Sequence, residues 1–131
     1  MDIVAKNYAL KVWSHVPYHV DKEKGLVGEP DYLIALKNKY GGMAKPALCV
    51  IEAKKDNFDE GWTQALAEMI ASSLLGTTLC YGVVTTGIIW QFGKLENDLF
   101  VIDANPLFAL TDLQSVFNAL KGLFHEIEER G

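Results

Sequence analysis

The chain has 131 residues, 50% hydrophobic and 22% charged, which predicts one globular domain with a core of its own. No apolar run reaches the ~18 residues of a membrane-spanning helix and no secretory leader is evident, so we expect a cytoplasmic protein without a membrane partner. Cys49 and Cys80 lack metal-site spacing and lie in apolar runs, which argues against a disulfide scaffold and predicts core positions.

Charge is distributed unevenly along the chain, whose net charge is −5. Residues 1–55 carry nine lysines and six acids, whereas residues 56–131 carry three basic and eleven acidic residues. Phosphate neutralisation supplies most non-specific affinity for nucleic acid, so the first part is the better candidate for such a surface. Arg130 is the only arginine. Bidentate guanine readout is therefore available only at the C-terminal end, and we expect no sequence-specific recognition by this domain alone.

Three strands are predicted in the first part of the chain. Residues 8–18 alternate partly between apolar and polar, up to Pro17. Residues 27–36 form the second predicted strand and residues 47–54 the third, after a loop punctuated by Gly-Gly and Pro. The third strand is apolar enough to be buried, so the charged residues at its end must emerge at an edge or in a cleft.

A helix is predicted to open at Asn57, which has Glu60 three residues on in capping-box spacing. Its predicted core stripe is Trp62, Leu66, Met69, Ile70 and Ser73. Strands over 78–85 and 88–92 are expected to form a hairpin through Thr86 and Gly87. A polar turn over 95–98 then leads to a strand over 99–102.

The last predicted element is an amphipathic helix. Thr111 and Gln114 have the spacing of a capping box at its start. The predicted packing stripe is Leu113, Val116, Phe117, Leu120, Phe124 and Ile127. Its expected role is packing against the sheet.

The charged residues of chemical interest lie at the ends of two predicted strands. Side chains alternate along a strand, so Glu52 and Lys54 are expected to share one face. Asp31 follows Pro30 in the strand before. Two carboxylates suit a hard divalent cation, and a lysine can orient water or stabilise phosphoryl charge. The simpler alternative is a solvent-facing ion pair at a strand end, which contributes about 0–1 kcal/mol.

Pro30-Asp31 followed by Glu52-Ala53-Lys54 resembles the PD-(D/E)XK phosphodiesterase superfamily. The resemblance covers roughly residues 12–93 and implies an α/β, restriction-endonuclease-like fold with a mixed central β-sheet flanked by helices. It further implies divalent-metal-dependent DNA hydrolysis, with Mg²⁺ or Mn²⁺ held by Asp31, Glu52 and the Ala53 carbonyl. Lys54 would position or activate the attacking water, and Gln64 matches a glutamine that many members carry on the next helix.

The chain departs from this family at its start and on the helix. Only residues 1–7 precede the first predicted strand, where the family has a helix that often supplies another acid, although residues 2–10 can form a short one. The third acid is not identified, and Glu23 and Glu29 are weak candidates. Glu68 stands where some relatives have a tyrosine.

Two other functions remain open at this point. The first is a catalytically inactive binding module that keeps the nuclease fold and docks to DNA or protein. The second is a structural subunit that does not contact nucleic acid. For the enzyme, the predicted partners are DNA together with a second copy or a larger protein.

Overall fold

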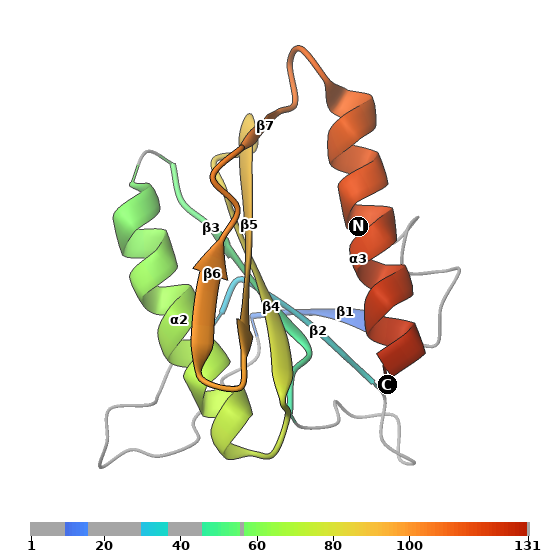
Figure 1. The fold of residues 1–131 in the computed structure, drawn as a ribbon. Coiled ribbons are helices and arrows are strands. Elements are labelled where there is room, and N and C mark those ends of the chain that lie inside the picture. Colours follow the sequence, from blue (N-terminus) through green and yellow to red (C-terminus); the bar gives the residue numbers. More distant parts are fainter. Residues whose placement is uncertain (1–9, 16–29, 37–45, 56, 131) are drawn as a thin grey trace.

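The computed structural model describes residues 10–15, 30–36, 46–55 and 57–130 (Figure 1). The elements in chain order are β1 (Leu10–Ser14), β2 (Tyr32–Leu36), β3 (Cys49–Ala53), α2 (Phe58–Leu74), β4 (Leu79–Thr85), β5 (Ile89–Glu96), β6 (Leu99–Ile102), β7 (Leu107–Phe108) and α3 (Leu113–Arg130). The predicted succession of three strands, helix, strands and helix is confirmed. The short strand β7 is an addition that the sequence did not reveal.

The seven strands form one mixed sheet in the order β1-β2-β3-β4-β5-β6, with β7 paired to the first residues of β5. Strands β3 and β4 are parallel, and all the other pairs are antiparallel. A parallel pair needs a crossover connection, which α2 provides here. The predicted mixed α/β architecture with flanking helices is confirmed at this level.

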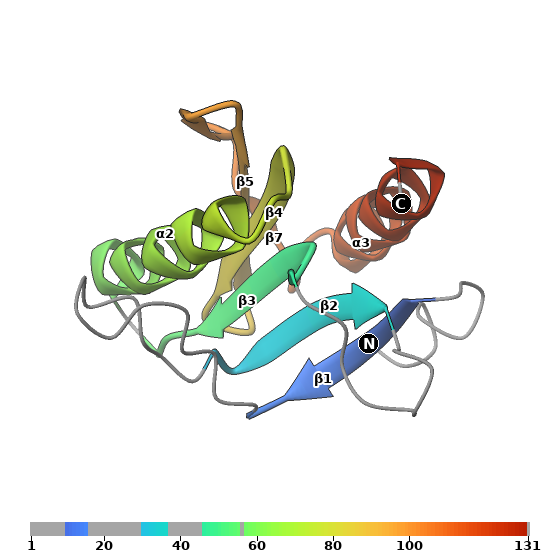
Figure 2. The same ribbon diagram turned by 90° about the horizontal axis from the view of Figure 1, so that it is seen from below.

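Helices α2 (Phe58–Leu74) and α3 (Leu113–Arg130) cover opposite faces of the sheet (Figure 2). Alternate residues of the central strands divide between two cores. The core beneath α2 contains Leu33, Val50, Trp62, Ala65, Met69, Cys80, Val84 and Leu95. The core beneath α3 contains Ile34, Cys49, Ile51, Val83, Leu123, Phe124 and Ile127. The two cysteines are therefore buried as predicted, one in each core.

Both helices begin at residues whose side chains accept backbone hydrogen bonds. Asn57 Oδ1 accepts from the Glu60 N–H at 3.0 Å, which confirms the predicted cap of α2. The predicted cap of α3 is wrong by one residue. Asp112 Oδ1 accepts from the Ser115 N–H at 3.1 Å, whereas Thr111 Oγ1 donates to the Phe108 carbonyl oxygen.

The strand β5 extends beyond its predicted end at Phe92. Residues 93–96 pair with both β4 and β6, so the predicted turn over 95–98 contracts to Asn97 and Asp98, with φ angles of 50° and 67°. Positive φ at both central residues is typical of the tight turn that joins two antiparallel strands.

The short N-terminal helix over 2–10 falls almost wholly outside the described residues, as do Glu23 and Glu29. No helix among the described residues is long and apolar enough to cross a membrane.

Candidate active site

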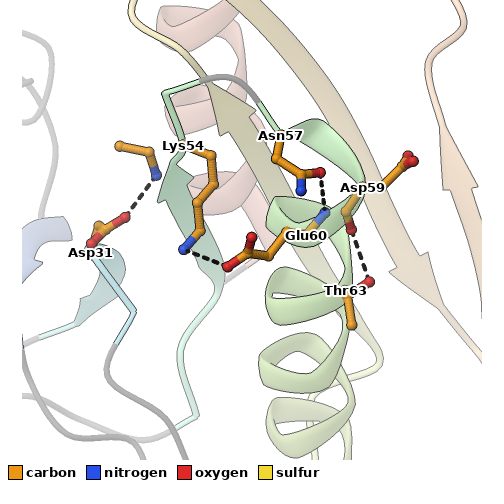
Figure 3. A network of polar contacts seen from close by, with 7 residues as sticks. Asp31, Lys54, Asn57, Asp59, Glu60 and Thr63 are labelled. Atoms are coloured by element: carbon orange, nitrogen blue, oxygen red, sulfur yellow. Dashed lines mark hydrogen bonds and ion pairs between the residues drawn. The ribbon is translucent and has the colours of Figure 1, made fainter.

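The end of β3 presents an acid and a lysine to the same helix. Glu52 lies beside Val84 of the parallel strand β4, and the Lys54 N–H donates to the Thr85 carbonyl oxygen at 2.8 Å. The Glu52 carboxyl group is hydrogen-bonded to Glu68 of α2. Lys54 Nζ lies 3.7 Å from Glu60 Oε1, also on α2 (Figure 3). The predicted shared face is therefore confirmed, and it is the face that α2 covers.

Asp31 reaches this segment from the neighbouring strand. Strands β2 and β3 are antiparallel with Tyr32 opposite Ile51, so the start of β2 lies beside the end of β3. Asp31 Oδ2 accepts a hydrogen bond from the Ala53 N–H at 2.8 Å (Figure 3). The negative charge of Asp31 also raises the pKa of Glu52 and of Glu68, so it acts electrostatically on both carboxyl groups. The structure thus brings Asp31, Glu52 and Lys54 together.

Glu68 is a member of this cluster that the sequence analysis did not select. Its side chain is 7% exposed and that of Glu52 is 2% exposed. Burial, followed by the hydrogen bond and the negative charge of Glu52, raises the pKa of Glu68 to about 10. Burial also raises the pKa of Glu52, against the hydrogen bond from Glu68, which lowers it. At neutral pH Glu68 therefore keeps its proton and donates it in a hydrogen bond to Glu52.

Small residues allow α2 to approach the sheet closely at this point. A Cβ atom on Gly61 would lie 2.6 Å from Val84 Cγ1 and 3.2 Å from Lys54 Cγ. The buried residues of α2 are Gly61, Trp62, Ala65, Glu68, Met69, Ala71 and Ser72. The predicted stripe is wrong at Ile70, which is 39% exposed. Glu68 lies three residues after Ala65 and four residues before Ser72. This helical spacing predicts that Glu68 shares their buried face, provided that small residues such as Ala65 and Ser72 are counted as core residues.

The donor set suits a divalent cation in its chemistry. Carboxylate oxygens are the preferred ligands of Mg²⁺, and Glu52 Oε2 and Glu68 Oε1 are buried without a hydrogen-bond partner among the described residues. In the described ranges, however, no group of three or more His, Cys, Asp or Glu residues is arranged to hold a metal ion. Asp31 already bonds to Ala53, and Glu52 to Glu68. Each of these contacts occupies one oxygen of its carboxylate, so a cation would have to bind through the other oxygen.

Of the two further predicted site residues, Gln64 lies apart from this cluster, whereas Ala53 contacts it through its backbone N–H. Gln64 is exposed on α2, and no hydrogen bond or ion pair joins it to the cluster in the part of the chain that the structure describes. The Ala53 side chain is exposed, and its backbone N–H is the group that contacts Asp31. The roles of Gln64 and of the Ala53 carbonyl remain predictions from the resemblance.

Comparisons with protein-family models, with curated proteins and with solved structures found no match to this chain. The resemblance to the PD-(D/E)XK superfamily therefore remains a prediction from the sequence. The residues that carry it are Glu52 in β3, Lys54 directly after β3 and Asp31 directly before the neighbouring strand β2.

Proposed function

We propose that this chain is a divalent-metal-dependent nuclease that hydrolyses phosphodiester bonds in DNA, with a fold of the PD-(D/E)XK type. The observation that supports the proposal is that Glu52 in β3 and Lys54 directly after it both face α2, with Asp31 beside this segment. A structural ion pair at a strand end would need only one acid. Here Asp31, Glu60 and the Glu52–Glu68 pair bring three negative charges near one lysine, which favours a divalent cation.

The proposed roles follow from the chemistry of each side chain. Asp31 and Glu52 would hold Mg²⁺ or Mn²⁺ with the Ala53 carbonyl, and the cation when bound would neutralise charge on the phosphoryl oxygens. Lys54 donates hydrogen bonds from Nζ, so it can hold a phosphate oxygen or the attacking water. Its main chain is fixed by the bond to Thr85, and its stem lies against Gly61. Gln64 belongs to the proposed site by the resemblance alone.

A non-catalytic binding module is the second candidate, and one observation favours it. The only carboxylate on β3, Glu52, is closed off beneath α2 by its hydrogen bond to Glu68. A catalytically inactive module that keeps the nuclease fold has no need to expose this acid to a cation or a phosphate. In that case DNA or protein binding would persist without hydrolysis.

Cleavage assays on Lys54 variants test the proposal. Plasmid and single-stranded DNA are incubated with the parent, Lys54→Ala and Lys55→Ala proteins, in Mn²⁺ or in EDTA. We expect cleavage by the parent only with Mn²⁺, its loss in Lys54→Ala, and its retention in Lys55→Ala, whose changed side chain is an exposed neighbour. Normal turnover in Lys54→Ala would remove this lysine from the mechanism. Retained DNA binding by a parent that never cleaves would favour the binding module.

Thermal unfolding tests the cation site without relying on turnover. Binding to the folded state alone stabilises it by about 1.4 kcal/mol when the free cation is about ten times Kd, so Mn²⁺ should raise the melting temperature of the parent. Glu52→Gln should cancel that rise. Without metal this variant should be no less stable than the parent, because a buried carboxylate with an unpartnered oxygen has been removed. A simple ion pair at the strand end predicts no Mn²⁺ effect in either protein.

A further inference from the structure

A cleft opens on the α2 face of the sheet, between the first turns of α2 and strands β5–β7. Its volume is about 460 Å³, within the range of about 300–1,000 Å³ that is usual for small-ligand sites. The walls are mainly apolar and include three aromatic rings. The residues that matter here are Phe58, Asp59, Trp62, Gln91 and Phe108.

The cleft lies beside the candidate active site, on the same face of the sheet. Glu52 is opposite Val84, and Val84 is opposite Gln91, so these residues form one row across β3, β4 and β5. Neighbouring strands are about 4.8 Å apart, which puts the main chains of Glu52 and Gln91 roughly 10 Å from each other. Gly61 of α2 packs on Val84 between them. The start of α2 therefore separates two adjoining sites.

The first turn of α2 contributes to both sites. Glu60 pairs with Lys54 on one side, whereas Phe58 and Asp59 line the cleft. Figure 3 shows the Asp59 carboxylate pointing away from Asp31 and Lys54. A DNA strand with a phosphate at Lys54 would need to cross only this turn to place a base in the cleft.

The polar groups of the cleft match the edge of a nucleobase. Trp62 Nε1 donates to Gln91 Oε1 at 2.6 Å, which fixes the orientation of the amide. No hydrogen bond of Gln91 Nε2 is found among the described residues, so its two N–H groups remain as donors for a ligand. Asp59 supplies a carboxylate acceptor at the rim. Base edges carry both acceptors and amino donors, and their flat faces stack on aromatic rings.

We propose that this cleft is a subsite for an unpaired nucleobase of a DNA strand whose phosphate lies at Lys54. The inference rests on the proposed nuclease function and deepens it, because it makes single-stranded DNA, or a base extruded from a duplex, the preferred substrate. Stacking is tolerant of base identity, which agrees with a chain that has a single arginine. A larger cavity of about 620 Å³ lies on the α3 face and has no lining residue from β3 or α2. It is therefore separate from the chemistry.

Binding of a short fluorescein-labelled single-stranded oligonucleotide in EDTA tests the subsite apart from hydrolysis. Phe108 is 47% exposed, so Phe108→Ala should leave the core intact. We expect about tenfold weaker binding in this variant, the scale of one lost base-stacking contact. The matched control is Phe117→Ala, an aromatic residue that is 40% exposed on α3 and outside the cleft. Equal affinities of the parent and Phe108→Ala would overturn the proposal.

An abasic oligonucleotide keeps the phosphates and removes the bases, so it isolates the claim about the base. On this strand the parent and Phe108→Ala should bind equally. Gln91→Glu keeps an acceptor for Trp62 Nε1 but removes the amide donor, so it should weaken binding of the normal strand more than of the abasic one. Equal losses on both strands would overturn a base contact at Gln91.

The two proposals fail in different ways. A stacking effect without Mn²⁺-dependent cleavage would retain the subsite and overturn hydrolysis. Cleavage with equal binding by the parent and Phe108→Ala would retain hydrolysis and overturn the subsite. A parent that binds neither strand would also overturn the subsite, whatever the cleavage assay gives.

Discussion

Helices α2 and α3 cover opposite faces of one sheet, yet they bury different kinds of residue. The buried residues of α3 are all apolar, namely Val116, Leu120, Leu123, Phe124 and Ile127. The buried face of α2 includes a glycine, a serine and a glutamate. Thus the described residues that α3 buries serve packing, whereas α2 approaches closely enough to contact Lys54 and to hold a carboxyl group on Glu52. A helix that helps to form a site gives up part of its regular apolar stripe.

The largest expected loss of stability distinguishes a core position of α3 from a position of α2 that was predicted to be core but is exposed. Phe124 is fully buried, so Phe124→Ala should lower the free energy of unfolding by about 3–5 kcal/mol. Ile70→Ala should cost less than about 1 kcal/mol, because Ile70 is 39% exposed. Urea denaturation of both variants measures the difference. Similar losses would mean that α2 buries the stripe first expected from its sequence.

Replacing a glycine with alanine should lower the stability of the protein when it is done in α2 and raise it when it is done in α3. Gly61→Ala places a Cβ 2.6 Å from the buried Val84 side chain, and we expect a loss of about 1–3 kcal/mol. Gly122→Ala on α3 meets nothing within 4 Å, so the higher helix propensity of alanine should stabilise it by up to about 1 kcal/mol. Both are measured by denaturant unfolding. Stabilisation by Gly61→Ala would contradict the close contact of α2 with the sheet.

The buried acid of α2 should make stability depend on pH. The pKa of Glu68 is raised from 4.5 to about 10 on folding. The contribution of Glu68 to the free energy of unfolding is therefore full below pH 4.5 and is lost as the pH rises toward 10. Glu68→Gln removes this loss while keeping a donor toward Glu52. We expect equal stabilities near pH 4 and a gain of up to about 5 kcal/mol at pH 8, at about 1.4 kcal/mol per pH unit above 4.5.

Melting curves between pH 4 and pH 8 measure this gain, with Glu128→Gln on α3 as the control. Glu128 is exposed, so its variant should follow the parent at every pH within about 0.5 kcal/mol. A Glu68→Gln protein that is less stable than the parent at pH 8 would mean that Glu68 is ionised in the folded state.

The smallest expected effect concerns the start of α3. Asp112→Ala removes the side chain that accepts from the Ser115 N–H and should cost about 1 kcal/mol. Thr111→Ala removes only a bond to the Phe108 carbonyl oxygen at 3.5 Å and should cost less. Thermal melts of the two variants decide between the adjacent candidates. The reverse order of losses would restore Thr111 as the cap.

Much of the fold was predictable because strands and caps are local features. The apolar runs of β3 and β4 and the Asn57 cap followed directly from residue types and spacing. The two-residue strand β7 did not, since it exists only by pairing with Ile89 and Trp90 of β5. Pairing with β4 and β6 likewise extends β5 beyond Phe92, its predicted end.

For the site, alternation along β3 predicted the shared face of Glu52 and Lys54. The approach of Asp31 depended on the register between β2 and β3, which no local pattern specifies. Glu68 was missed because a glutamate on a helix is usually solvent-exposed. Only the close approach of α2, permitted by Gly61, turns it into a buried partner of Glu52.

The order of strands in the sheet has a consequence for folding kinetics. Strands β1 to β6 lie side by side in the order in which they occur in the chain, so no strand has to insert between two that are already paired. Contacts between neighbours in sequence form fastest. The parallel pair β3–β4 is the exception, because it needs α2 in place. The candidate active site lies at this junction, so we expect it to assemble in the slow step of folding and to be among the first regions lost on unfolding.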